Sequence, residues 1–256
     1  MSGPDSVVVH LPGEAMGGLV CAIAQMSDAD LGRYAIVGGV AVAARLGQAH
    51  RATRDVDTVV DQDHVPAAIA VLMALPSATA DPAGGPHRVL LEGTKVEVLE
   101  VGLMPNEEGL AGLSERQRLF VVSHSWALAT ATSLTVVTTG PNVDRATAPF
   151  ATPAALVAMK LHAIQDRSGD GQDKRAGDAW DLHQLLTHHN RGGEISRSVR
   201  SGPAELRDAV QVAVRRVLIE GAARTRVWLH SSGGPQAGVS AEEIHRLGQE
   251  LLDGLN

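Results

Sequence analysis

The chain has 256 residues and a mass of 26.7 kDa, which is enough for one large domain or two modest ones. Apolar residues make up 44% of it, so a chain that is disordered throughout is excluded. Lys and Arg number 22 against 29 Asp and Glu, and the net charge of −7 excludes a uniformly basic nucleic-acid-coating protein while leaving a local basic face open. Aromatic residues make up only 2%, which disfavours RNA binding through an aromatic stacking platform.

The charge is distributed unevenly along the chain. Residues 1–145 carry 9 basic and 16 acidic residues, whereas residues 146–256 carry 13 of each. Within 191–226, eight Arg stand against four acidic residues. We therefore predict one domain over residues 1–145 and a second over residues 146–256, with a linker near Pro141–Phe150.

The first half alternates short strand-like runs with helix-like segments. Apolar or alternating β-branched runs predict strands, and the Ala-rich or longer apolar segments between them predict helices. The expected strands are 34–37, 55–60, 89–91 and 95–101, and the expected helices are 40–46 and 65–75. This alternation indicates an α/β class with a mixed sheet and flanking helices.

The second half has a helical pattern. Helices are expected over 153–167, 177–188, 203–219 and 240–252. Ser240 followed three residues later by Glu243 has the spacing of a capping box. His188 and His189 end one of these helices, and because helix C-termini favour His, we interpret them as structural and not as a zinc site.

Three features of the first half point to one site. Gly38 and Gly39 follow a predicted strand and open a helix, where backbone amides can approach phosphate oxygens. Asp55 and Asp57 are two apart on a strand, so both carboxylates project from one face. Glu97, on the strand expected beside them, supplies a third carboxylate, and hard oxygen ligands of this kind favour Mg²⁺.

Simpler interpretations of these residues stay open. A glycine pair is often only a turn, and an Asp-x-Asp is often a solvated strand end. Glu100 lies three residues beyond Glu97, with a strand parity that would point it to the opposite face. The order and spacing of the three features favour a functional site, because they constrain position as well as residue type.

A family resemblance follows from these motifs. Gly38-Gly39 with Arg51-Ala52-Thr53-Arg54-Asp55-Val56-Asp57 resembles the nucleotidyltransferase superfamily, whose glycine pair and Asp-x-Asp mark a triphosphate and metal site. The Arg-x-Thr ahead of the acids is similar to the AbiEii-type nucleotidyltransferase toxins, which include the MenT group. Met159–Ala163 with Arg167 resembles the Lys-Leu-x-Ala motif of that branch, and Asp178–Leu182 resembles its Asp-x-x-Asp-Leu motif. The resemblance covers roughly residues 30–190.

The second-half motifs also have a physical interpretation. Lys160 and Arg167 are seven residues apart, so they share one face of the expected helix. A Lys directed at the β- and γ-phosphates would neutralise charge on a pyrophosphate leaving group. Asp178 and Asp181 would orient Lys160 or pair with Arg167. The alternative is a pair of helices linked by surface salt bridges, which contribute little to stability.

Residues just ahead of the acids are further candidates. Thr53 shares the strand face of Asp55 and would lie at the mouth of the metal site, although it could simply satisfy a backbone group. The family resemblance implies that a hydroxyl here can be phosphorylated by an antitoxin kinase, blocking triphosphate binding. Arg51 and Arg54 are candidate nucleotide or acceptor contacts, and a surface role is the alternative for both. The Arg-rich stretch 191–226 could meet RNA phosphates, although such a helix face is more often only solvated.

The resemblance implies a nucleotidyltransferase fold over 1–145, with the helical region 146–256 completing the cleft. The expected reaction moves a nucleoside monophosphate from an NTP to an acceptor hydroxyl and releases pyrophosphate. Two Mg²⁺ would be held by Asp55, Asp57 and Glu97. The phosphates would be bound by Gly38 and Gly39. The resemblance implies a toxin of a toxin–antitoxin pair, with a tRNA 3′ end as acceptor and a cognate antitoxin as partner.

Two alternatives remain for the function. An aminoglycoside-type, small-molecule nucleotidyltransferase would share the Asp-x-Asp chemistry and differ in its acceptor. A non-catalytic binding module would keep the fold without the activity. The single cysteine, Cys21, cannot form an intramolecular disulfide, so we expect a cytoplasmic protein, and no apolar stretch is long enough for a membrane span.

Overall fold

The computed structural model describes residues 7–102, 108–141, 143–166, 172–231 and 233–256. The chain divides into two compact units, each built from two separate segments. The first unit comprises residues 1–103 and 125–152, and the second comprises residues 104–124 and 153–256. Residue 145, where the sequence predicted the boundary between the domains, is instead the first residue of a strand that belongs to the first unit.

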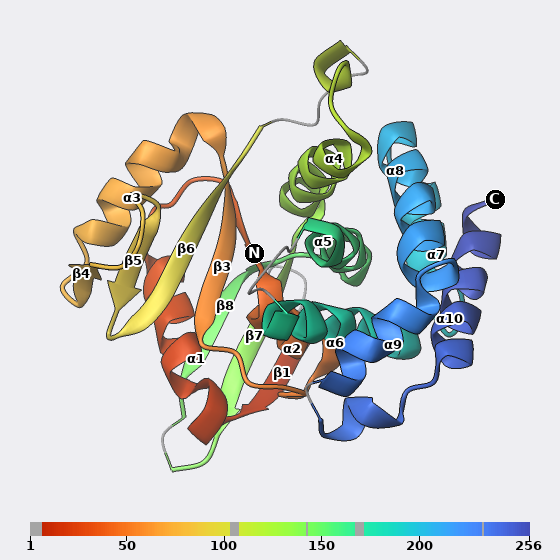
Figure 1. Cartoon of the computed structure of the whole chain (residues 1–256). Helices are drawn as coiled ribbons and strands as arrows, with labels where there is room; N and C mark the ends of the chain where they lie inside the picture. Colours follow the sequence, from red (N-terminus) through yellow and green to blue (C-terminus); the bar gives the residue numbers. More distant parts are fainter. Residues whose placement is uncertain (1–6, 103–107, 142, 167–171, 232) are drawn as a thin grey trace. The chain divides into compact units, whose positions relative to one another are not determined.

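The first unit is built on one mixed sheet (Figure 1). In the described part of the chain this sheet has eight strands in the order β1-β7-β8-β2-β3-β6-β5-β4. Parallel pairing joins β1 to β7, β2 to β8 and β3 to β6, and the other neighbours are antiparallel. The strands are β1 (Val7–Pro12), β2 (Tyr34–Val37), β3 (Asp55–Asp61), β4 (Ala78–Ala80), β5 (Arg88–Leu91), β6 (Thr94–Val101), β7 (Thr132–Thr139) and β8 (Arg145–Phe150). A mixed α/β class is therefore confirmed.

Helices of the first unit pack on this sheet. They are α1 (Gly13–Asp28), α2 (Gly38–Leu46) and α3 (Val65–Met73), the last preceded by the short turn η1 (Gln62–His64). Helix α1 contacts β7 and β8, α2 contacts β2 and β3, and α3 contacts β4 and β5. The core of this unit is formed by buried apolar side chains from α1 and from the strands. Examples are Ile23 of α1, Ile36 of β2 and Val96 of β6.

Arg45 holds α2 in place against the sheet. Its guanidinium donates to the carbonyl oxygens of Phe150, at 2.6 Å, and Ala151, at 2.8 Å, and to the Thr132 hydroxyl at 2.7 Å. Burial lowers the pKa of Arg45 to about 10. The C-terminal end of α2 is thus fixed to the end of β8.

The expected linker is wrong, because residues 145–150 form β8. Ala146, Ala148 and Phe150 alternate as buried residues, and this strand pairs with both β7 and β2. Small Ala side chains give a weak strand signal, and Pro149 argues against a strand inside a sheet. The residues are buried as a strand only because β7 and β2 lie on either side of them.

The second unit is helical. Its helices are α5 (Pro153–Asp166), α6 (Gln172–His189), α7 (Glu194–Arg200), α8 (Ala204–Val214), the π-helical turn η4 (Arg215–Ile219), α9 (Ala222–Ser231) and α10 (Ala241–Leu255), with short turns η2 (Glu108–Leu110) and η5 (Pro235–Gly238). The division between the units falls inside α4 (Glu115–Thr130). The four helices expected here are present, while α7 and α9 were not expected. None of the helices in the described ranges has the length and apolar character needed to cross a bilayer.

Candidate active site

The start of α2 is shaped around the carboxylate of Asp57. Val37, the last residue of β2, pairs with Asp57 of β3, and the chain then turns into α2 at Gly38 with φ of 68°. A Cβ placed on Gly38 would lie only 2.1 Å from Asp57 Oδ2. Glycine is therefore required at this position for two reasons: its left-handed backbone and the close approach of the carboxylate.

Gly39 makes a similar close approach to the segment ahead of β3. A Cβ on Gly39 would lie 2.7 Å from Arg51 Nη2 and 2.8 Å from Thr53 Oγ1. The glycine pair, Arg51, Thr53 and Asp57 therefore meet at the first turn of α2. Arg54 is exposed, and no described contact brings it to this place.

The three predicted carboxylates lie on one face of two neighbouring strands. Asp55 pairs with Lys95 and Asp57 pairs with Glu97 in the parallel register of β3 and β6. Directly paired residues of adjacent strands project from the same face. Glu100 pairs with Val60, at the opposite parity, and is exposed. The expectation that Glu97 lies on the strand beside the two acids is therefore confirmed.

Two basic residues contact these carboxylates. Lys95 Nζ lies 2.8 Å from Asp55 Oδ2 and 3.7 Å from Glu97 Oε2. Arg88 Nη2, from β5, donates to Glu97 Oε1 at 3.1 Å. The hydrogen bond to Asp55 raises the pKa of Lys95, and the hydrogen bond to Glu97 raises the pKa of Arg88. Both cations stay charged at neutral pH and balance the carboxylates.

The carboxylates of Asp55, Asp57 and Glu97 offer oxygen donors for a metal ion. Among the described residues, no three His, Cys, Asp or Glu side chains converge as a metal centre. The Lys95 ammonium instead lies between Asp55 and Glu97, which shows that these two oxygens already converge on a cation. Carboxylate oxygens are the donors that Mg²⁺ prefers, so the donor set fits the metal once Lys95 Nζ is displaced.

The second unit gathers three of the other predicted residues. Lys160 of α5 contacts both acids of α6, with Nζ 2.7 Å from Asp178 Oδ1 and 2.7 Å from Asp181 Oδ2. All three side chains are buried, and that of Asp181 has no exposed surface. The interpretation as surface salt bridges is therefore wrong, because the three charged groups are buried. Removing one partner of a buried ion group leaves an uncompensated buried charge, which lowers the stability of the fold. Arg167 lies outside the described residues.

Sequence reasoning missed Lys95 and Arg88. The signal for Lys95 was available, because Lys95-Val96-Glu97 has the two-residue spacing that places Lys95 and Glu97 on one strand face. Arg88 had no such signal. Its contact with Glu97 depends on the antiparallel register of β5 and β6, which pairs the two residues directly.

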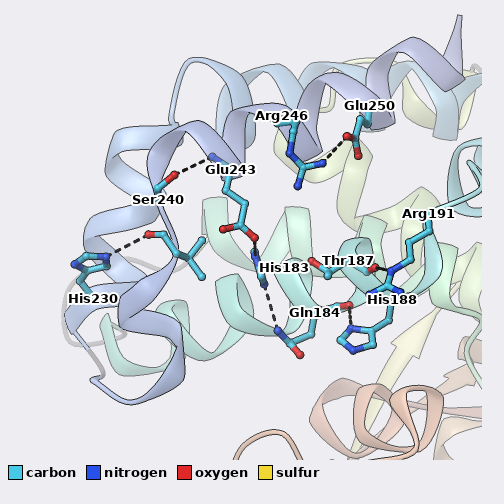
Figure 2. A network of polar contacts seen from close by, with 11 residues as sticks. His183, Gln184, Thr187, His188, Arg191, His230, Ser240, Glu243, Arg246 and Glu250 are labelled. Atoms are coloured by element: carbon cyan, nitrogen blue, oxygen red, sulfur yellow. Dashed lines mark hydrogen bonds and ion pairs between the residues drawn. The ribbon is translucent and has the colours of Figure 1, made fainter.

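The histidines and the expected capping box form a separate network (Figure 2). His188 Nδ1 lies 2.9 Å from the carbonyl oxygen of Gln184, one turn earlier on α6. Ser240 Oγ accepts from the backbone amide of Glu243 at 3.1 Å, which confirms Ser240 as the N-cap of α10. The Glu243 carboxylate contacts His183 Nε2 at 2.9 Å, so this network links α6 to α10.

Comparisons with known proteins add no family assignment. A comparison of the chain with models of known protein families finds no match, and a comparison with curated proteins finds none either.

Proposed function

We propose that the protein is an Mg²⁺-dependent nucleotidyltransferase that transfers a nucleoside monophosphate from an NTP to an acceptor hydroxyl. The observation that carries this proposal is the position of Asp57. Its carboxylate lies against Gly38 at the first turn of α2 and is paired in register with Glu97. A triphosphate bound at the helix start would thus lie beside the acids needed to hold its counter-ions.

The glycine pair would bind the phosphates. Gly38 and Gly39 carry no side chains of their own at the N-terminus of α2, and helix N-termini favour anions through their amides and dipole. Arg51 lies against Gly39 and would add a guanidinium to the same phosphates. Thr53, beside it, is the hydroxyl at which phosphorylation would place competing negative charge.

Asp55, Asp57 and Glu97 would hold the metal. Bound Mg²⁺ supplies charge neutralisation for the triphosphate and lowers the pKa of a coordinated acceptor hydroxyl. Arg88 holds Glu97 by its hydrogen bond, and Lys95 holds Asp55, so these two acids are oriented before substrate arrives. Glu97 would also accept the proton of the acceptor hydroxyl.

The helical unit would supply the remaining charge. Lys160 is proposed to act on the triphosphate, with Asp178 and Asp181 fixing its ammonium. The family resemblance extends the proposal to a toxin of a toxin–antitoxin pair that modifies the 3′ end of tRNA. An aminoglycoside-type acceptor is the main alternative, since the chemistry at Asp55 and Asp57 is the same.

The experiment is to incubate the purified protein with each α-³²P-labelled NTP and Mg²⁺. Parallel reactions receive total tRNA, an aminoglycoside mixture or no acceptor. We expect label in tRNA from at least one NTP and none when Mg²⁺ is replaced by excess EDTA. Label in the aminoglycoside alone would support the small-molecule alternative, and no label in any reaction would contradict nucleotidyl transfer.

Matched variants assign the activity to the site. Asp57→Asn should reduce transfer by at least about 100-fold, because it removes a charge that is needed for the transition state. Glu100→Gln is the control, since Glu100 lies on β6 beside Glu97 in sequence but has the opposite strand parity. Equal loss in both variants would show that the effect is not specific to the proposed site.

A further inference from the structure

A cavity of about 490 Å³ in the helical unit is lined by four arginines and one tryptophan. Its walls come from the start of α4, the end of α5, α6, the π-helical turn η4 and α9, all within the second unit. The basic residues are Arg116, Arg175, Arg216 and Arg224, and Trp228 is the aromatic one. Glu115 is the one acidic residue of the described lining.

The four guanidinium groups fall into two pairs. Arg116 and Arg216 each contact a carboxylate, with Arg216 Nη2 lying 2.7 Å from Glu115 Oε2 and Arg116 Nε 3.4 Å from Asp166 Oδ1. These two ion pairs are about half exposed and are therefore weak and easily exchanged for another anion.

Arg175 and Arg224 are held in a different way. Arg175 Cζ lies 4.9 Å and Arg224 Cζ 5.6 Å from the centre of the Trp228 ring. No described carboxylate pairs with either residue, and Arg175 Nε is buried without a described hydrogen-bond partner. An indole fixes a guanidinium by cation–π attraction but does not neutralise it, so both positive charges remain available to an anionic ligand.

This arrangement distinguishes the cavity from an ordinary solvated arginine face. Three other arginines of the 191–226 stretch are engaged locally: Arg191 donates to the Thr187 carbonyl, Arg197 to the Gly192 carbonyl, and Arg207 pairs with Asp208. Only Arg216 and Arg224 of that stretch line the cavity, where Arg116 and Arg175 join them from other helices. Folding thus concentrates positive charge at this one place.

We propose that the Arg–Trp cavity binds the phosphodiester backbone of single-stranded RNA. Guanidinium groups from four separate elements match a series of phosphates better than a single one, and their planar faces can stack on unpaired bases. This inference rests on the proposed function for its biological meaning, since RNA would then be the acceptor. Binding itself requires neither NTP nor Mg²⁺, so it can be tested separately.

The test is the anisotropy of a fluorescein-labelled 12-nucleotide single-stranded RNA titrated with protein in EDTA, over a series of salt concentrations. We expect the double variant Arg175→Gln with Arg224→Gln to weaken binding at least about tenfold. Because each phosphate contact on a single strand contributes about 0.7 to the salt slope, that slope should fall by about 1.4. Arg226→Gln, an exposed arginine on α9 that does not line the cavity, is the control and should change binding by less than about threefold.

Trp228 gives a second, independent readout. Trp228→Leu should weaken RNA binding by loosening both guanidinium groups, and Trp228→Phe should restore part of it because an aromatic face returns. If the leucine variant fails to fold, as judged by circular dichroism, the phenylalanine variant and the arginine pair still decide the question.

Several outcomes would overturn the inference. These are unchanged RNA affinity in the arginine double variant, equal loss in Arg226→Gln, or competition by ATP or polyglutamate as effective as that by unlabelled RNA. Failure of the proposed function looks different: no NTP would be incorporated by the wild-type protein, whatever the RNA affinity. Conversely, nucleotidyl transfer together with RNA affinity that does not depend on Arg175 and Arg224 would contradict this inference and leave the proposed function standing.

Discussion

The carboxylate of Asp57 occupies the space that a side chain on Gly38 would need. A Cβ there would lie 2.1 Å from Asp57 Oδ2 and 2.9 Å from its Cγ, so the glycine and the acid fit only as a pair. The contact joins the first turn of α2 to the end of the β2–β3 pair, where Val37 pairs with Asp57. Backbone conformation and acid position are therefore coupled at the proposed triphosphate site.

Gly38→Ala should consequently abolish transfer as effectively as Asp57→Asn. The substitution forces alanine into φ of 68°, which costs on the order of 1 kcal/mol, and displaces the Asp57 carboxylate as well. Gly47→Ala is a matched control, because Gly47 ends the same helix with φ of 69° but has no atom within 4 Å of its Cβ position. It should lose similar backbone stability yet keep full activity. Transfer rates and urea unfolding of both variants measure this difference, and equal activity in the two would contradict the coupling.

Lys95 should compete with Mg²⁺ for Asp55 and Glu97. Its ammonium lies between their oxygens, so Lys95→Met should leave the carboxylates repelling each other and increase the stabilisation by added metal. The measurement is the shift in thermal midpoint between EDTA and 10 mM Mg²⁺. We expect a larger shift for Lys95→Met than for the wild type. The control Glu100→Gln should show the same shift as the wild type. An identical shift in all three proteins would show that Lys95 and the metal do not share these ligands.

Lys160→Met should destabilise the protein by about 3–5 kcal/mol. The substitution leaves Asp178 and Asp181 buried without the cation that lies 2.7 Å from each. Adding Asp178→Asn and Asp181→Asn to the same variant should recover much of the loss, because the uncompensated charges are then gone. Urea unfolding followed by circular dichroism tests this. A loss below about 1 kcal/mol in the single variant would contradict tight electrostatic coupling.

The recovered triple variant also separates folding from catalysis. If Lys160 acts on the triphosphate, the triple variant should be folded and inactive. A folded and active triple variant would limit Lys160, Asp178 and Asp181 to a structural role.

Stability should fall as the pH drops from about 6.5 to 4, partly through His124. Burial of this imidazole lowers its pKa from 6.5 to about 4, with a smaller contribution from His162. The folded-state pKa is below the unfolded one, so in this window the unfolded chain binds a proton that the folded chain does not, which favours unfolding as pH falls. The full difference corresponds to about 3 kcal/mol. The measurement is the free energy of urea unfolding at pH 7 and at pH 4.5. The difference between the two pH values should be smaller in His124→Gln than in the wild type. It should equal that of the wild type in His245→Gln, a control at an exposed position.

The alternating strands and the glycine pair were predictable because local pattern determines them. β2, α2, β3 and β6 follow from β-branched alternation and from Gly38-Gly39, and two-residue spacing is enough to place Asp55 and Asp57 on one face. β8 was not predictable, since Ala146, Ala148 and Pro149 have little strand preference of their own. Its conformation is imposed by its neighbours β7 and β2.

The same distinction applies to the candidate sites. Lys160, Asp178 and Asp181 were predicted as a group because helical spacing brings them to defined faces, but their burial was not, since it depends on how α5 packs on α6. The Arg–Trp cavity was the least predictable feature. Arg116 and Arg175 are 59 residues apart and Arg175 and Arg224 are 49 apart, and no local pattern relates them.

The interleaving of the two units along the chain has a consequence for how the protein can be dissected. Because 125–152 returns to the first unit after 104–124 has joined the second, no single cut yields both units whole. A fragment ending at residue 145 would lack β8, and the facing edges of β7 and β2 would then be left as unpaired hydrogen-bonding edges inside the sheet order. Independent expression of the sheet unit would require a deletion of the inserted segment with a short bridge in its place, so that β7 and β8 stay covalently attached to the strands they complete.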